Sequence, residues 1–186
     1  MKNLYTRFLF LLFINVFLYG NYFEDMSGGA SVDKVETAGD VLQVALPVAA
    51  LGSTYILDDK EGRVEFWKSY ISSISLTYLL KYTIEKTRPN GDCCESFPSG
   101  HTTAAFSGAM FIQKKYGLKY GIPSLVLASF VGYSRVYADK HYWEDVMVGA
   151  SIGIIGNILF TNKYNNSNMS FYKDRDNIHL TLGIGF

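Results

Sequence analysis

Residues 98–105 read PSGHTTAA, and this stretch decides how the middle of the chain folds. Ser99 is a favourable helix cap, because its hydroxyl can accept a hydrogen bond from a free amide of the first turn. The helix that it starts would place Gly100 and His101 at its positive end, where free amides and a small residue suit a bound anion. A histidine there can donate a proton to a phosphate ester oxygen. On its own, the stretch fits a capped helix with a surface histidine equally well.

Helical patterns extend from this stretch in both directions. Polar or glycine-containing breaks separate them, and the alternation typical of a strand occurs only near the C-terminus. We therefore predict an all-α protein, a compact bundle of five to six helices with a short β-like tail at the C-terminus. The five predicted helices cover residues 39–57, 63–87, 100–116, 121–137 and 141–162.

Charge and hydropathy exclude one class of function and leave two environments open. The 186 residues carry 17 basic and 17 acidic side chains, so the chain fits one domain and has no positive excess for a nucleic-acid partner. Apolar residues make up 48% of the chain, but mean hydropathy is only +0.08. The longest uncharged stretch would rise about 25 Å as a helix, against a hydrocarbon core of about 30 Å. A membrane-embedded bundle and a soluble all-α domain both fit.

The two ends of the chain differ from its middle. Residues 1–20 have the charged start and short apolar run of a secretory signal peptide or an N-terminal membrane anchor. We expect residues 21–38 to form a loop or loosely held arm, residues 39–163 the helical domain and residues 164–186 a peripheral tail. Either interpretation of the first segment takes the bulk of the chain out of the cytoplasm.

The two cysteines, Cys93 and Cys94, are adjacent. Across a trans peptide their Cα atoms would lie about 3.8 Å apart, which is shorter than ordinary disulfide geometry allows. Their spacing also does not match a cysteine-based metal site. We expect small loop residues, with bonds to another chain as the alternative.

The second group of polar residues is basic. Lys81 and Arg88 are seven residues apart at the end of one predicted helix, which Pro89 terminates. Two helical turns would bring both cations to the same side. In isolation these residues, together with Lys86, would be a solvated basic stripe.

The third group combines a cation with a histidine and a carboxylate. Arg135, which follows Ser134, offers a guanidinium fork for a tetrahedral oxyanion. His141 and Asp145 are spaced so that the carboxylate can keep one ring nitrogen protonated and leave the other free as a nucleophile. Alone, such a pair would be structural by default. Together the three groups suit the binding of a phosphoryl group and its transfer to a histidine.

In order and spacing, the three groups resemble the signature of the type 2 phosphatidic acid phosphatase (PAP2) superfamily, which also includes bacterial class A acid phosphatases and vanadium haloperoxidases. The resemblance covers about residues 39–162 and leaves the N-terminal segment and the tail uncovered. The matching positions are Lys81, Arg88, Pro89, Pro98, Ser99, Gly100, His101, Ser134, Arg135, His141 and Asp145.

The resemblance implies a role for each of these residues. His141 would attack phosphorus in line and become phosphohistidine, and Asp145 would fix its tautomer. His101 would protonate the leaving oxygen and then activate water. The resemblance implies no metal and no cofactor. The phosphate-binding residues that it implies are Lys81, Arg88, Ser99, Gly100 and Arg135.

We therefore predict a phosphatase that acts on a phosphomonoester or pyrophosphate of a membrane lipid, such as phosphatidic acid, a polyprenyl diphosphate or a lipopolysaccharide phosphate. Apolar, aromatic-rich helices favour the lipid and an inner-membrane location with a periplasm-facing site. The alternatives are a soluble periplasmic acid phosphatase of broad specificity, a vanadium haloperoxidase and a non-catalytic envelope protein. The sequence predicts no nucleic-acid partner and does not define an oligomeric state.

Overall fold

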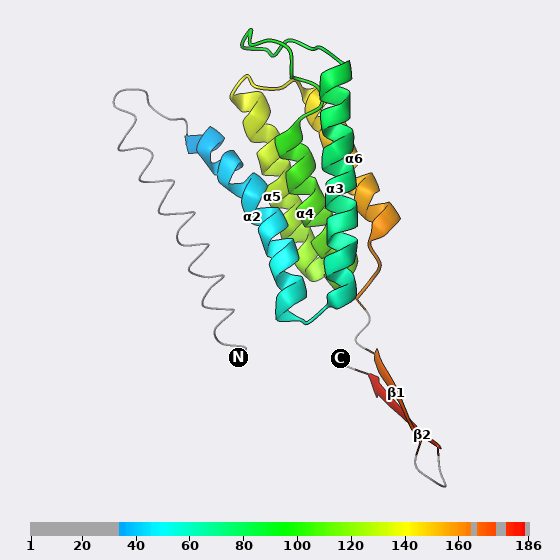
Figure 1. Ribbon diagram of the computed structural model, residues 1–186. Helices are drawn as coiled ribbons and strands as arrows, with labels where there is room; N and C mark the ends of the chain where they lie inside the picture. The colour runs from blue at the N-terminus through cyan, green and yellow to red at the C-terminus, as the bar shows by residue number, and fades with distance from the viewer. Residues whose placement is uncertain (1–33, 165–166, 174–177, 185–186) are drawn as a thin grey trace.

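The computed structural model describes residues 34–164, 167–173 and 178–184 (Figure 1). Its helices lie side by side in one bundle, and a two-stranded hairpin follows them in the chain. The prediction of an all-α bundle of five to six helices is therefore confirmed. The elements are α2 (Lys34–Ile56), α3 (Lys60–Thr83), α4 (Gly100–Tyr116), α5 (Leu118–Tyr137), α6 (Trp143–Phe160), β1 (Ser167–Lys173) and β2 (Ile178–Ile184).

Helix α4 lies at the centre of the bundle and packs against each of the other four helices (Figure 1). Its inward positions are small, and Ala105 and Ala109 are fully buried. A Cβ at Gly108 would come within 2.6 Å of the backbone carbonyl carbon of Leu46 in α2. Small residues on α4 therefore let its neighbours approach closely.

Helix α6 packs on α4 through two glycines. A Cβ at Gly149 would lie 2.5 Å from the carbonyl oxygen of Ser99, and one at Gly153 would lie 2.8 Å from the amide nitrogen of Ser107. The close approach brings the first turn of α6 against the first turn of α4, where the Ser99 amide donates to the Asp145 carbonyl at 3.0 Å. Packing of these two helices thus sets the spacing of two of the predicted polar groups.

Helix α2 begins at Lys34, so residues 34–38, the end of the predicted arm, are helical instead of a loop. Gly39, which the sequence suggested as the start of the domain, is a packing glycine. A Cβ there would collide with the Ser134 hydroxyl of α5. A glycine at a helix crossing and a glycine at a helix boundary look the same in a sequence.

Helix α3 ends at Thr83, and the prediction that Lys81 and Arg88 share one helix is wrong. Ile84, which follows the last helical residue, has extended backbone. Instead of continuing the helix, Lys86 pairs with Glu95 in an isolated bridge. Arg88 also precedes a proline, which disfavours helical backbone at that position.

The C-terminal tail forms an antiparallel hairpin, with Ser167 opposite Ile184 and Lys173 opposite Ile178. This agrees with the predicted β-like tail. The predicted signal peptide or anchor lies outside the described residues. Cys93 and Cys94 lie in the connection between α3 and α4, and the expectation that they are small loop residues stays a prediction.

Candidate active site

The three polar groups meet at one end of the bundle, around a cavity of about 370 Å³. Lys81 lies in the last turn of α3, and Gly100 and His101 begin α4. His141 precedes α6, and Arg88 lies in the connection between α3 and α4. These five predicted residues therefore share one cavity. Its lining consists of Gln43, Tyr70, Ile74, Tyr78, Lys81, Arg88, Glu95, Gly100, His101, Ala104 and His141.

The other three predicted site residues, Ser99, Arg135 and Asp145, are buried and do not line the cavity. Ser99 caps α4 as predicted, since its hydroxyl accepts hydrogen bonds from the Thr102 amide at 3.4 Å and the Thr102 hydroxyl at 2.9 Å. Its own hydroxyl hydrogen takes part in neither of these two bonds.

His141 is oriented by a backbone carbonyl. Its Nδ1 lies 2.7 Å from the Ser96 carbonyl oxygen, and because a carbonyl only accepts, Nδ1 carries the hydrogen. Burial lowers the pKa of His141 to about 4, with help from the positive charges of Lys81 and Arg88 and against the opposing effects of Ser96 and Asp145. At neutral pH the ring is therefore neutral, with the lone pair on Nε2.

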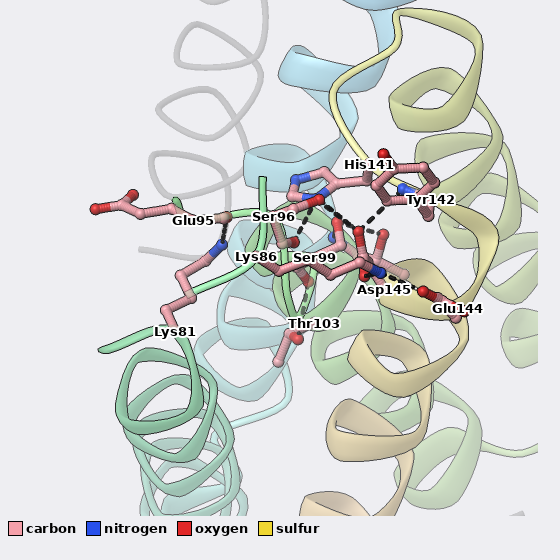
Figure 2. A network of polar contacts seen from close by, with 11 residues as sticks. Lys81, Lys86, Glu95, Ser96, Ser99, Thr103, His141, Tyr142, Glu144 and Asp145 are labelled. Atoms are coloured by element: carbon pink, nitrogen blue, oxygen red, sulfur yellow. Dashed lines mark hydrogen bonds and ion pairs between the residues drawn. The ribbon is translucent and has the colours of Figure 1, made fainter. Parts of the chain in front are cut away.

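Asp145 supports this histidine indirectly. Its Oδ2 is 3.8 Å from His141 Nδ1, which is beyond hydrogen-bond distance. The Ser96 carbonyl, instead of the predicted direct contact with Asp145, holds the tautomer of His141. Instead Oδ2 accepts from the Ser96 hydroxyl at 2.5 Å and from the Tyr142 amide at 2.9 Å. Lys86 donates to Oδ1 at 2.7 Å. Figure 2 shows these donors converging on one carboxylate.

The two cations at the cavity differ in how firmly they are held. Lys81 is buried and donates to the Glu95 carbonyl at 2.6 Å, as Figure 2 shows. Arg88 has its backbone fixed, since its amide donates to the Asp92 carbonyl at 2.9 Å. Its side chain lines the cavity without a bond to another described residue. The cavity therefore joins two positive charges to a neutral histidine and the N-terminus of α4.

Arg135 and His101 are joined by a carboxylate outside the predicted set. Asp40 Oδ1 lies 2.8 Å from Arg135 Nη1 and 3.1 Å from His101 Nε2. Arg135 also donates to the Glu36 carbonyl at 2.7 Å. The guanidinium predicted to bind phosphate is thus held by α2, beside the histidine predicted to act as the acid.

An apolar groove of about 290 Å³ lies between α2 and α3 and shares Gln43, Tyr70 and Ala104 with the polar cavity. Because they share these lining residues, the groove and the polar cavity are adjacent. The other groove residues are Val44, Pro47, Val48, Leu51, Phe66 and Trp67.

Sequence reasoning missed three residues of this site. The sequence interpretation places Lys86 in a solvated basic stripe, whereas its ammonium contacts Asp145. Asp40 stands alone at the start of a long uncharged stretch, and this isolated carboxylate was a usable signal of a functional residue. Ser96 gave none, because it contacts His141 through its backbone carbonyl, an atom that every residue has.

Comparisons with known proteins agree with the arrangement. A family model described as the PAP2 superfamily matches residues 64–169. The lipid A 4'-phosphatase of Helicobacter pylori is 30% identical over 185 residues, which are 94% of this chain and 90% of that protein. The lipid A 1-phosphatase of Porphyromonas gingivalis is 29% identical over 138 residues, which are 68% of this chain and only 30% of that protein.

Among solved structures, the crystal structure of Aquifex aeolicus LpxE is 27% identical, with a TM-score of 0.48, and the match covers 64% of this chain and 83% of that one. The family match spans more than half of this chain, and the Helicobacter relative is matched almost end to end. The expectation of a PAP2-type phosphatase is thereby confirmed at the level of the family: the chain belongs to the PAP2 superfamily.

Proposed function

We propose that this protein hydrolyses a phosphate monoester of a membrane lipid, through a phosphohistidine formed on His141. One observation carries the proposal. The cavity places the neutral His141 beside Lys81, Arg88 and the N-terminus of α4, and an apolar groove lies next to it. The lipid phosphate would sit in the cavity and an acyl chain would lie in the groove.

In the first step, His141 Nε2 attacks phosphorus in line with the bond to the leaving oxygen. The nitrogen–phosphorus bond forms as the phosphorus–oxygen bond breaks, and His101 transfers its proton to the departing oxygen. Asp40 forms an ion pair with His101 when that ring is protonated, because its carboxylate is 3.1 Å from Nε2. In the second step, His101 takes a proton from water and the water oxygen attacks phosphorus. The nitrogen–phosphorus bond breaks, its electron pair returns to His141 Nε2, and phosphate is released.

Positive groups stabilise the equatorial oxygens while charge shifts among them. Lys81 and Arg88 would bind from the cavity wall, and the Gly100 amide and the Ser99 hydroxyl from the N-terminus of α4. Arg135 would act from behind His101, where it holds Asp40 at 2.8 Å. We expect no metal to be required.

The substrate we propose is a lipid A phosphate. Two relatives carry lipid A phosphatase names, and the one matched over 90% of its length is named for the 4'-phosphate. A polyprenyl diphosphate is the second candidate, because the undecaprenyl-diphosphatase BcrC of Bacillus subtilis is 37% identical over 67 residues.

A location in the membrane, with the site on the periplasmic side, follows from the same proposal. Helices α2 and α6 are long and apolar enough to cross a bilayer. Large apolar side chains also face outward on the bundle, such as Ile71 at 56% exposure and Leu159 at 69%. A soluble enzyme rarely exposes this much apolar surface.

The test measures phosphate release by the purified full-length protein in detergent, with chelator present. Lipid A carrying either phosphate alone, phosphatidic acid, a polyprenyl diphosphate and p-nitrophenyl phosphate are compared. We expect lipid A to have the highest kcat/KM, and His141→Ala to lower it by a factor of about 10³ or more. A phosphorylated protein should be trapped by rapid quench in alkali from wild type only.

Three outcomes would overturn parts of the proposal. A preference for p-nitrophenyl phosphate over every lipid would favour a broad acid phosphatase. Activity that disappears with chelator would contradict the metal-free mechanism. No turnover by folded wild-type protein, with halide oxidation when vanadate and peroxide are added, would indicate a haloperoxidase.

A further inference from the structure

Lys86 contacts the deepest charge of the site, although neither the family signature nor the mechanism above uses it. Its ammonium donates to Asp145 Oδ1 at 2.7 Å and pairs with Glu144. It also lies 4.4 Å from the centre of the Tyr142 ring, within the range of a cation–π contact. Among the described residues, it is the only lysine or arginine within ion-pair distance of Asp145.

The backbone fixes Lys86 in this place. Lys86 and Glu95 form a parallel bridge, and the Ser96 amide donates to the Lys86 carbonyl at 2.9 Å. Lys86 and Ser96 are thus held side by side and bond to the two different oxygens of Asp145. Figure 2 shows both side chains reaching the same carboxylate. A lysine that merely extends into solvent would have no such constraint.

The charge on Lys86 matters because Asp145 is completely buried. A buried carboxylate is stable only when charge or hydrogen bonds compensate it. Of its three donors, the Ser96 hydroxyl and the Tyr142 amide are neutral, so Lys86 is the one donor that carries a compensating charge. Burial opposes the charged form of Lys86, but its hydrogen bonds to Asp145 and Glu144 raise the pKa of Lys86 above its ordinary value.

We propose that Lys86 is a positioning residue that neutralises Asp145 and thereby keeps His141 neutral and nucleophilic, an inference that rests on the proposed role of His141. Asp145 Oδ2 is 3.8 Å from His141 Nδ1. Without Lys86, this carboxylate would favour an imidazolium. An imidazolium has no lone pair on Nε2 and cannot attack phosphorus.

The other charges around His141 stay in place when Lys86 is changed, so the substitution isolates one interaction. They come from four separate parts of the fold. Among the described residues, the charged and titratable groups around His141 are Tyr70, Tyr78 and Lys81 of α3, Arg88 and Glu95 of the connection between α3 and α4, His101 of α4 and Asp145 of α6.

The experiment compares Lys86→Gln, which keeps a hydrogen-bond donor but loses the charge, with Lys86→Arg, which keeps the charge. The readout is the pH profile of kcat/KM, whose acid limb reports protonation of His141 in the free enzyme. Neutral His141 is the active form, so activity falls as pH drops through its pKa. In Lys86→Gln the acid limb should move to higher pH by about one unit. In Lys86→Arg it should stay within a few tenths of a unit of wild type.

A second readout does not require turnover. The pKa of His141, followed by NMR of isotope-labelled histidine in detergent, should rise in Lys86→Gln and not in Lys86→Arg. The matched control is Lys114→Gln in α4, a partly exposed lysine that donates to the Ile158 carbonyl, and it should leave both readouts unchanged.

Two results would overturn the inference about Lys86. One is an acid limb and a His141 titration in Lys86→Gln that superimpose on wild type. The other is an equal loss of activity at every pH that Lys86→Arg does not restore, which would assign Lys86 a space-filling role. A wild-type enzyme without activity would instead contradict the proposed function, and the NMR titration would still test the effect of Lys86 on His141.

Discussion

Asp40 joins two of the predicted site residues from an element that the signature does not include. Its Oδ1 lies 2.8 Å from Arg135 and 3.1 Å from His101. An ion pair at such a distance disfavours rotation of the imidazole away from Asp40. A residue of α2 thus determines how the proposed acid faces the cavity.

We predict that Asp40→Asn lowers kcat by a factor of about 10 to 100 and changes KM less, because it weakens proton donation by His101 more than phosphate binding. Steady-state kinetics on the preferred lipid would measure both constants. Aryl phosphates with good leaving groups should be affected less, since they need less protonation. Equal losses on good and poor leaving groups would contradict the role assigned to Asp40.

At the scale of helices, the contact between α4 and α6 sets the geometry of the site. Gly149 lies against the Ser99 carbonyl oxygen, to which an added Cβ would approach within 2.5 Å. The obstacle is backbone at the start of α4, which cannot rotate away as a flexible side chain could. Any side chain at this position must push the two helices apart.

We therefore predict that Gly149→Ala destabilises the protein by about 1–3 kcal/mol and lowers kcat/KM at least about tenfold, because Asp145 shifts relative to Ser99. Denaturant unfolding in detergent and kinetics would measure the two effects. Ser151→Ala, on the exposed face of the same helix, is the control and should resemble wild type. A Gly149→Ala enzyme with wild-type stability and rate would show that α4 and α6 tolerate a wider spacing.

Local signals explain which elements the sequence predicted well. The start of α4 was predictable because Ser99 is a strong cap, and the break before α3 contains Asp59, which caps that helix by accepting from the Gly62 amide at 2.8 Å. The end of α3 was not, because Lys86 leaves the helix to pair with Glu95. That pairing is a tertiary contact without a local pattern.

The same distinction holds for the site. The three groups of the signature were predictable because their residue types, order and spacing resemble a family signature, although Arg88 lies beyond the end of α3 and His141 before the start of α6. Partners such as Asp40 and Ser96 come from other elements, and only the packed fold shows which residues they meet. The contact between Asp40 and His101, for example, joins α2 to α4 across the bundle.

At the scale of the whole molecule, the bundle carries the cavity at one end and exposes large apolar side chains on its sides. One tryptophan lies in each of these regions. Trp143 begins α6 beside the site, and Trp67 lies on α3, about 21 Å along the helix from Lys81. Both are exposed, at 58% and 46%. They therefore report how the bundle sits in a bilayer.

We predict that in vesicles Trp67 is quenched most by lipids brominated near the chain ends, and Trp143 by lipids brominated near the headgroup. Trp143→Phe and Trp67→Phe give the two single-tryptophan proteins, and fluorescence measures the quenching. Absence of quenching in both proteins, together with release of the protein by osmotic shock, would contradict a membrane location.

The position of the cavity at one end of the bundle also determines on which side of a bilayer the reaction takes place. The cavity is formed where α3 ends and where α4 and α6 begin, all at the same end of the molecule. For a bundle seated in a bilayer, only one leaflet can present its headgroups to that end. Lipids of the opposite leaflet would keep their phosphates, so the enzyme would create and maintain a charge difference between the two leaflets.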